Sequence, residues 1–437
     1  MAEESLGDVE RPAVPFRSAL GFWFKLGWIS FGGPTGQIAL MHAEVVDRKK
    51  WVDEDHFLHA LNYCMLLPGP EAQQLATYLG WLMHGTLGGI VAGSLFVIPS
   101  IFILLALSWV YAAHGEVRWV AAIFYGLQPA VMAIVADAVL RIGKRALKNG
   151  WMYSIAGLAF AALFFFHAAF PLIIVLAGVI GWFGGKIAPR AFVVIGGHGA
   201  SSTRPSERPL GPRPTLGRAL RVIAVCGVLW WTPVVVAGFF QGRDGVFVQQ
   251  GLFFSKAAMV TFGGAYSVLP YVTHSAVENY HWLTPNEMLS GLGLAESTPG
   301  PLIMVLQFVG FMGGWRNPGT LAPWLSATTG ALMTTWVTFL PCFLWIFLGA
   351  PYIERLRGNA RLSAALSTIT AAVVGVVLNL AFWFAQNVLW PTGGGFDTFA
   401  LAVALVAFAG MQRFKWDVVY VVLGSGAVGL LVRHVFA

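Results

Sequence analysis

The sequence predicts an all-α polytopic membrane protein with two homologous repeats of inverted topology and broken or re-entrant helices. Of its 437 residues, 57% are hydrophobic and only 11% are charged, a composition unlike that of soluble domains. A helix needs roughly 20 apolar residues to cross a bilayer, and many such runs occur. In addition, one set of motifs occurs twice, and the loop charges of the two halves are distributed in opposite senses.

The duplicated motifs lie at a constant spacing. Lys256 follows Lys25 by 231 residues (256 − 25), and a Phe-Gly-Gly, a Trp and a Pro-Gly-Pro recur at the same offset. These residues are Gly32, Gly33, Trp51, Pro68, Gly69 and Pro70 in the first copy, and Gly263, Gly264, Trp282, Pro299, Gly300 and Pro301 in the second. Further along, the offset grows to 242 residues (379 − 137), which pairs Asp137 with Asn379. The pattern indicates an internal duplication.

In chain order, residues 1–15 form a polar, acidic tail that we expect to be mobile and to remain in the protein. The first repeat is expected over 16–185, a basic cytoplasmic linker over 186–221, and the second repeat over 222–437, with its core at about 247–390. Apolar segments are expected at 18–40, 57–80, 84–111, 119–140, 151–168 and 170–185, and then at 222–240, 250–272, 287–313, 325–348, 362–386, 397–411 and 416–434.

Basic residues in matching loops predict that the repeats are inverted. The loop 141–150 carries four of them, whereas 112–118 carries only Arg118. In the second half, the loop matching 112–118 carries Arg355, Arg357 and Arg361, and 387–397 carries none. Because Lys and Arg mark cytoplasmic loops, the copies are expected to be upside down relative to each other.

The number of crossings depends on the four segments that contain the glycine and proline motifs. If every apolar segment crosses, the chain has 13 crossings, and Arg48, Lys49 and Lys50 lie outside, against the charge bias. If 18–40, 57–80, 250–272 and 287–313 turn back, about nine crossings remain. We favour these re-entrant segments. In both cases the N-terminus is expected to be cytoplasmic and the C-terminus periplasmic.

The motifs predict breaks in helices at membrane depth. Glycine disfavours a helix by about 1 kcal/mol and permits positive φ, and new helices are expected to begin at Pro70 and Pro301. A helix start exposes unpaired N–H groups and the positive end of its dipole. Two inverted pairs of breaks can therefore surround one anion site, to which Ser30, Thr261, Ser297 and Thr298 could add hydroxyl donors. The structural alternative is packing kinks; the duplication of all four breaks favours the site.

Charged residues within apolar segments are functional candidates. Lys25 and Lys256 are either anion ligands or lysines that extend to the membrane interface. Glu71, Glu296 and Asp137 are candidates for coupling, although Glu71 could simply stabilise a helix N-terminus. An ionised Glu71 would repel a dianion, so we expect it to be protonated when substrate is bound, or to point away.

Several stretches resemble the chromate ion transporter family in its long, fused two-repeat form. They are FKLGWISFGGPTGQIALMHAEVV, RKKWVDEDHFLHALNYCMLLPGPEAQQLATYLG and, in the second half, VTFGG and STPGP. The resemblance covers nearly the whole chain. It implies a multi-pass protein of the bacterial inner membrane that exports chromate and confers chromate resistance, with sulfate as an analogue of the substrate.

Two other functions stay open. One is the import or exchange of sulfate; the other, from a different class, is a membrane-bound reductase, although no nucleotide, haem or iron–sulfur motif occurs. The three cysteines lie far apart and lack metal-ligand spacing, so no metal and no cofactor are expected. The net charge of +7 lies mostly in loops, which indicates orientation in the lipid bilayer rather than nucleic-acid binding. Whether the chain forms a homodimer is left open.

Overall fold

The structure, a computed structural model, describes residues 14–31, 33–193, 215–350, 360–391 and 394–435. Nearly all of the tail 1–15 and most of the linker 186–221 lie outside the described residues. The described residues form helices and no strand, as the sequence predicts.

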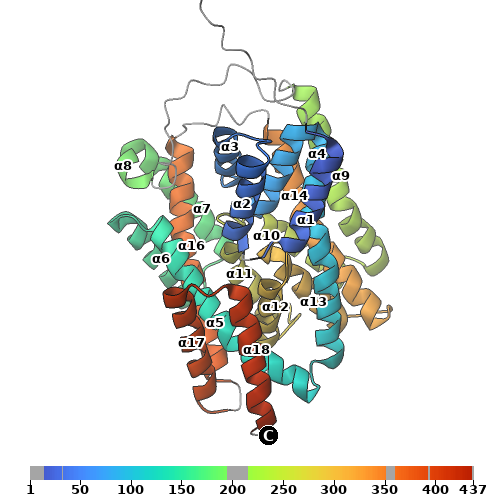
Figure 1. The fold of residues 1–437 in the computed structure, drawn as a ribbon, viewed down its shortest axis with the longest axis vertical. Helices are drawn as coiled ribbons and strands as arrows, with labels where there is room; N and C mark the ends of the chain where they lie inside the picture. Colours follow the sequence, from blue (N-terminus) through green and yellow to red (C-terminus); the bar gives the residue numbers. More distant parts are fainter. Residues whose placement is uncertain (1–13, 32, 194–214, 351–359, 392–393, 436–437) are drawn as a thin grey trace, which may run out of the picture.

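The first half contains α1 (Phe16–Ile29), α2 (Gly33–His42), the π-helix η1 (Ala43–Arg48), α3 (Glu54–Cys64), α4 (Glu71–His114), α5 (Arg118–Ala146), α6 (Gly150–Phe166), α7 (Phe170–Ile187) and α8 (Pro189–Phe192). Next come α9 (Leu216–Gln241), α10 (Val246–Met259), α11 (Ala265–His274), the π-helix η2 (Ser275–Asn279), α12 (Pro285–Ser297), the 3₁₀-helix η3 (Leu302–Met304), α13 (Val305–Arg316), α14 (Pro323–Gly349), α16 (Ala360–Leu389), α17 (Thr398–Phe414) and α18 (Val418–Val435) (Figure 1).

The long helix α4 is a hairpin of two helices. His84 and Gly85 have non-helical backbone angles, and Gly85 has φ 62°. Gly80 and Gly88 pack against each other across the turn, so closely that a Cβ on Gly80 would lie 2.4 Å from the Gly88 carbonyl oxygen. The chain therefore reverses at Gly85, and the part of α4 after the turn runs antiparallel to the part before it.

Two segments of the first repeat turn back on themselves. Trp51, which follows α2 and η1, packs edge-on against Phe22 of α1 with ring centroids 5.8 Å apart. The His84 ring nitrogen lies 2.8 Å from the Val14 carbonyl oxygen, just before α1. Had α1 and α2 crossed the bilayer together, Trp51 would lie far from Phe22. The segment α1–α2 and the segment from α3 to the turn of α4 are therefore re-entrant, as expected.

The second repeat contains the same turns. Trp282 packs against Phe253 of α10 at 5.9 Å, which matches the contact of Trp51. Each copy also has a π-helix after its second helix, followed by a left-handed residue, Lys50 (φ 50°) or His281 (φ 52°). The duplication is thus visible in backbone geometry as well as in sequence.

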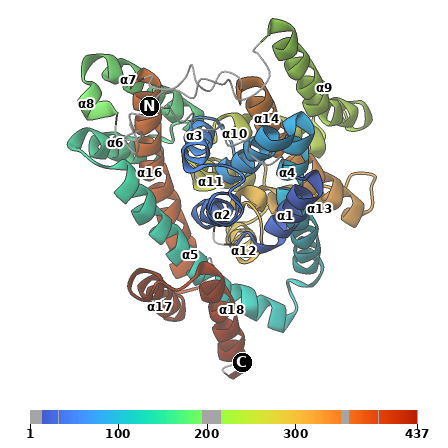
Figure 2. The same cartoon turned by 45° about the horizontal axis from the view of Figure 1, so that its top comes forward.

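The homologous helices α5 and α16 run in opposite directions. Near the start of α5, the Tyr125 hydroxyl donates to Asp397, just beyond the end of α16, at 2.7 Å. At the other end, Asn149 after α5 bonds the Ala191 carbonyl oxygen at 2.7 Å, and Gly185 of α7 packs against the start of α16. The predicted inversion is confirmed. Figure 2 shows α5 and α16 side by side. The broken helix α12 packs on α5, and α11 packs on α16.

The outer helices exchange partners between the repeats. The hairpin α6–α7 of the first repeat packs on α16, and the hairpin α17–α18 of the second packs on α5. Helix α9 is largely exposed and lies at the edge of the molecule (Figure 2). The domain boundaries stay predictions.

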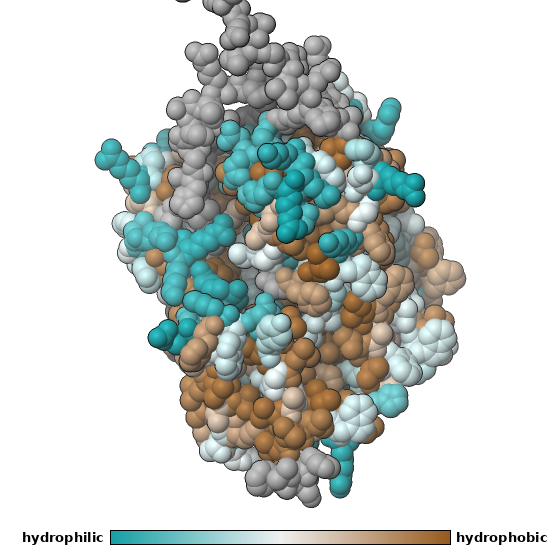
Figure 3. All heavy atoms as spheres, in the orientation of Figure 1, coloured by the Kyte–Doolittle hydropathy of each residue, from teal (hydrophilic) through white to brown (hydrophobic). Residues whose placement is uncertain are grey.

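Within the described part of the chain, six helices are long and apolar enough to cross a membrane: α4, α5, α7, α9, α14 and α16. Helices α6, α17 and α18 have 17 or 18 residues. On the face in Figure 3, hydrophilic residues gather over the upper part and apolar residues over the lower part. The beginning of α1 and the end of α18 lie at opposite ends of the molecule (Figure 1).

We call the end where α1 begins the basic end. It is defined by Arg17, Arg48, Lys49, Lys50, Lys144, Arg145, Lys148, Lys186, Arg190, Arg361, Arg413 and Lys415. At the opposite end, the described basic residues are Arg118, Arg243, Arg316 and Arg433.

Candidate functional site

The four breaks meet in pairs, each pair joining the two repeats. The Gly69 N–H donates to the Thr261 carbonyl oxygen at 2.7 Å, and the Gly300 N–H donates to the Ser30 carbonyl oxygen at 2.9 Å. A Pro-Gly-Pro of one repeat is thus bound to the Phe-Gly-Gly break of the other, and a two-fold operation that exchanges the repeats maps one bond onto the other. We call these residues the crossed breaks.

Buried broken backbone needs such partners, because an unpaired peptide group in a membrane is unfavourable by several kcal/mol. Gln37 of α2 adds two more hydrogen bonds, from its amide nitrogen to Gly300 O at 2.7 Å and to Ser30 O at 3.1 Å. At the other pair, Gln74 donates to Pro68 O at 2.7 Å.

The glycines of the two motifs differ in their surroundings. Gly69 (φ 123°) and Gly300 (φ 108°) are tightly packed: a Cβ would lie 2.7 Å from Cys342 Sγ in the first case and 2.6 Å from Ser100 Cβ in the second. Gly33 (φ 71°) and Gly264 (φ 95°) have no atom within 4 Å of the Cβ position. Open space therefore adjoins the Phe-Gly-Gly breaks, and tight packing surrounds the Pro-Gly-Pro breaks. Gly32 lies outside the described residues, and Gly263 (φ 77°) has only Thr370 near its Cβ position.

The prolines start helices one residue later than expected. Pro70 and Pro301 have extended backbone and are the N-caps of α4 and η3, so the helices begin at Glu71 and Leu302. The N-cap residue stands half outside the helix, which explains the difference. Pro299 is buried beside them.

The four hydroxyl candidates already donate to nearby carbonyls. Ser30 bonds Leu26 O at 2.5 Å and Thr261 bonds Ala257 O at 2.7 Å. Ser297 bonds Leu294 O at 3.0 Å and Thr298 bonds Ala295 O at 3.2 Å. In this conformation the hydroxyls satisfy the ends of the broken helices, so their role toward an anion stays a prediction.

The two lysine candidates lie on exposed faces of α1 and α10. Lys25 and Lys256 are exposed on faces that also expose Trp28 and Met259. This position suits a lysine whose stem lies along apolar surface while its ammonium reaches the interface. Their binding role stays a prediction that this arrangement does not favour.

The three buried carboxylate candidates lie on three different helices. Glu71 is buried as the first residue of α4. Glu296, at the end of α12, accepts a hydrogen bond from the Tyr266 hydroxyl of α11. Asp137 of α5 pairs with Arg141 at 2.6 Å and accepts a hydrogen bond from Gln412 of α17. No sequence motif points to Gln37, Gln74, Tyr266, Arg141 or Gln412 as site residues.

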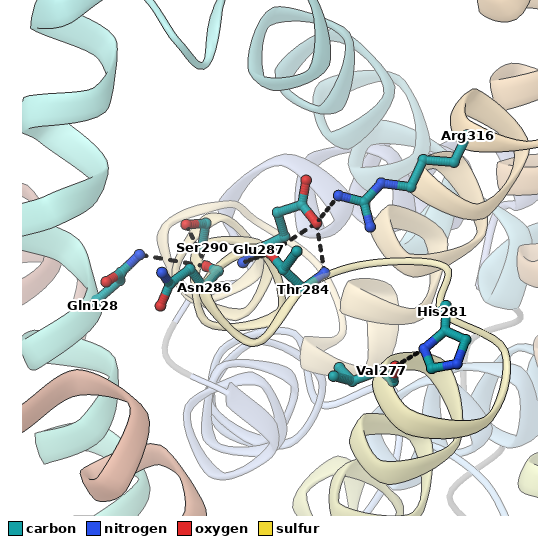
Figure 4. Close-up of polar contacts among 8 residues, drawn as sticks. All are labelled: Gln128, Val277, His281, Thr284, Asn286, Glu287, Ser290 and Arg316. Carbon is teal, nitrogen blue, oxygen red and sulfur yellow. Dashed lines mark hydrogen bonds and ion pairs between the residues drawn. The ribbon is translucent and has the colours of Figure 1, made fainter. Parts of the chain in front are cut away.

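A small polar network joins the start of α12 to the end of α13 (Figure 4). Thr284 and Glu287 form a capping box at the start of α12. Glu287 also binds Arg316, the last residue of α13, at 2.7 Å. The helices α12 and α13, which flank the second Pro-Gly-Pro, are thereby joined at their ends remote from the break.

The comparisons with known proteins identify the family. The sequence model described as "Chromate transporter" matches residues 18–182 and 248–430. The chain belongs to the chromate transporter family. The two matched regions correspond to the two inverted repeats, so this chromate transporter family member carries the family unit twice.

Relatives of full length and of half length are found. A "Chromate transport protein" of Pseudomonas aeruginosa is 29% identical over 99% of this chain and 96% of its own length. Another "Chromate transport protein", of Cupriavidus metallidurans, is 27% identical over 96% of this chain and 94% of its own. An uncharacterized transporter of Bacillus subtilis is 31% identical over 32% of this chain and 72% of its own. No solved structure matches the chain.

Proposed function

We propose that the protein exports chromate across the bacterial inner membrane by alternating access and thereby gives chromate resistance. The observation that carries the proposal is the pair of crossed breaks, buried between two inverted repeats. Family membership and the names of the full-length relatives support chromate as the substrate.

The open space beside Gly33 and Gly264 is the proposed place of the anion. These glycines stand at the starts of α2 and α11, where free N–H groups and the helix dipole favour negative charge. The Gly69 and Gly300 N–H groups are already bonded across the repeats. In this proposal the Phe-Gly-Gly breaks bind the anion and the Pro-Gly-Pro breaks hold the frame.

The membrane potential supplies a driving force for export. With a potential that is negative inside, an anion leaves with about 2.3 kcal/mol per charge per 100 mV, so a dianion gains twice that. The proposed orientation has the basic end in the cytoplasm, since basic residues mark that side. The N-terminus is then cytoplasmic and the C-terminus periplasmic.

Transport by the purified protein in proteoliposomes with a set potential tests the function. We expect chromate flux that follows the potential in the direction of anion exit and that is inhibited by sulfate. Absence of chromate flux together with electrogenic sulfate flux would replace the proposal by sulfate transport. Reduction of chromate by the protein without flux would indicate a reductase.

A further inference from the structure

Two arginines stand one turn apart near the end of α5: Arg145 at the basic end, and Arg141 one turn deeper. Residues four apart lie on one side of a helix, with Cβ atoms roughly 5–6 Å apart. Both arginines are exposed, and each lies near a residue next to one of the Pro-Gly-Pro breaks. Lys148 differs, because its ammonium bonds the Lys144 carbonyl oxygen at 2.6 Å. The two arginines thus link the end of α5 to the breaks.

Arg145 reaches the break of the first repeat. Its guanidinium lies 3.4 Å from the sulfur of Met65, three residues before Pro68. It also interacts electrostatically with Glu71, which directly follows Pro70. A thioether is a weak acceptor, and among the described residues no carboxylate lies within ion-pair distance of Arg145. Most of its five N–H donors are therefore available to a ligand.

Helix α12 brings Glu296, beside the second break, to Arg141. The start of α12 accepts a hydrogen bond from Gln128 of α5 at 3.5 Å. Nearer the end of α12, a Cβ on Gly293 would lie 3.1 Å from the side chain of Val131 on α5. The helix therefore advances along α5 toward Arg141, and Glu296 at its end interacts electrostatically with this arginine.

Arg141 also stands near the open space at Gly264. Tyr266, the second residue of α11, donates its hydroxyl to Glu296 and interacts electrostatically with Arg141. Gly264, two residues earlier, is the N-cap of α11 and has no atom within 4 Å of its Cβ position. The ion pair of Arg141 with Asp137, at 2.6 Å, leaves 48% of the arginine side chain exposed. This cation is therefore close to the proposed place of the anion and accessible to it.

The internal duplication gives the two arginines equivalent neighbours. Met65 and Glu296 are separated by 231 residues (296 − 65), which is the offset of the duplicated motifs. One helix thus directs a guanidinium to the same position of each repeat. The positions 242 residues beyond the two arginines, on α16, are Trp383 and Asn387, so the homologous helix carries no cation there. The pair belongs to α5 and to the side of the basic end.

We propose that Arg141 and Arg145 together bind the tetrahedral dianion that enters from the basic end, each beside the proline break of one repeat. The inference rests on the proposed transport function, and it adds charged ligands to the N–H groups of the Phe-Gly-Gly breaks. A guanidinium can bind two oxygens of an oxyanion at once, and two guanidiniums balance the charge of a dianion. In the proposed orientation the pair stands on the cytoplasmic side, where an exported anion is taken up.

Three carboxylates compete with the anion for these guanidiniums: Asp137 and Glu296 at Arg141, and Glu71 at Arg145. Arginines alone would retain a dianion, since charge-assisted hydrogen bonds are about twice as strong as neutral ones. Competition weakens the binding and allows the anion to leave. It also means that Asp137 and Arg141 affect binding in opposite senses.

The affinity of sulfate and chromate for the full-length protein in detergent, measured by titration calorimetry, tests the pair. Arg141→Gln and Arg145→Gln should each weaken sulfate binding about tenfold or more, because a charged hydrogen-bond donor is lost. Lys144→Gln removes the same charge from the same end of α5 and should change the affinity by less than about twofold, because water and salt screen an exposed charge. Unchanged affinity in either arginine variant, or an equal loss in the lysine variant, would overturn the proposal.

The partners of the ion pair separate a binding role from a structural one. Asp137→Asn should strengthen sulfate binding about threefold, because it releases Arg141; equal or weaker binding would show that the pair is structural and would overturn the proposal. Where a glutamine variant is not recovered as folded protein, Arg141→Lys or Arg145→Lys replaces it. Lysine keeps the charge but cannot bind two oxygens in the same way, so sulfate binding should weaken about fivefold. Unchanged affinity would contradict the inference.

The selectivity of binding tests whether the two guanidiniums act together. Perchlorate is a tetrahedral monoanion, so the loss of one arginine should weaken its binding less than that of sulfate; equal losses would refute a paired site for a dianion. Chromate flux in proteoliposomes is measured in parallel. Arginine-dependent binding without flux would leave the site standing and refute only the transport function. Flux with binding that does not depend on the arginines would refute only this inference.

Discussion

The glycines of the crossed breaks perform different tasks at the scale of single residues. Gly69 and Gly300 combine positive φ with contacts that leave no room for a methyl group. Alanine there must shift buried neighbours, which is unfavourable by about 1–3 kcal/mol, in addition to about 1 kcal/mol for the left-handed backbone. We expect Gly69→Ala and Gly300→Ala to lower the thermal stability of the detergent-solubilised protein. Gly21→Ala, in α1 with open space at its Cβ, is the control and should not lower stability, because alanine favours a helix over glycine by about 1 kcal/mol. Thermal stability of Gly69→Ala and Gly300→Ala equal to that of the unaltered protein would contradict the packing argument.

Substitution of Gly33 or Gly264 should affect transport rather than stability. Their Cβ positions are open, so a leucine side chain would occupy the space proposed for the anion. Gly33→Leu and Gly264→Leu should each abolish chromate flux while the protein still inserts into the membrane. Flux in proteoliposomes and the amount of membrane-inserted protein are measured together. Normal flux in either variant would reduce that glycine to a packing kink.

An ionised Glu71, buried at the start of α4, would repel a dianion bound nearby. If Glu71 takes up a proton when chromate binds, affinity must weaken as pH rises through the range in which the carboxyl loses that proton. Glu71→Gln resembles the protonated form, so it should retain binding and flatten this dependence. Chromate affinity against pH, for both proteins in detergent, provides the measurement. The same slope in the variant would leave Glu71 with the structural role of starting α4.

At the scale of elements, Gln37 joins α2 to both segments of one pair of crossed breaks, through Ser30 and Gly300. The second copy has Val268 at the matching position, so the amide is specific to the first. Gln37→Val removes two hydrogen bonds and leaves the Gly300 carbonyl oxygen without this donor, which should lower stability by about 1–3 kcal/mol. Thermal unfolding in detergent measures the loss. Gln128→Val, at an exposed amide, is the control; a loss of the same size there would show that the effect is not specific to the break.

The sequence predicts the elements well where a local rule decides them. Glycine and proline chemistry indicates all four breaks, and the constant offset indicates that they are paired. The sequence cannot predict which break binds which, because the hydrogen bond between Gly69 and Thr261 depends on how the two repeats pack. For the same reason Gln37 and Tyr266 were missed: their partners are remote in sequence. Lys25 and Lys256 were singled out by duplication alone, which does not tell a lipid-facing side from a buried one.

For the whole molecule, the inverted arrangement can be tested by reporter fusions. Fusions after Lys148 and after Arg357 should both report the cytoplasm, because basic loops remain there. Fusions near Gly115 and Gly394 should report the opposite side. Paired activity reporters for the two compartments give the measurement. Agreement between the matching sites 148 and 394, or 115 and 357, would refute the inversion in the membrane.

Helix α9 explains how one chain holds two units of opposite orientation. Each re-entrant segment returns to the side it left, and four helices then alternate across the first repeat, so that repeat ends on the side where it began. Joining a second copy directly would give both copies the same orientation. Helix α9 adds one crossing between the copies, so the number of crossings before the second copy becomes odd. The second copy therefore begins on the other side of the membrane and has the opposite orientation. Because α9 is needed only to carry the chain across the membrane once, it requires few contacts with other helices. This accounts for its exposed apolar surface, which includes Phe239 and Phe240. A chain containing a single copy would have no such helix. Two such chains could build this arrangement only by inserting into the membrane in opposite orientations.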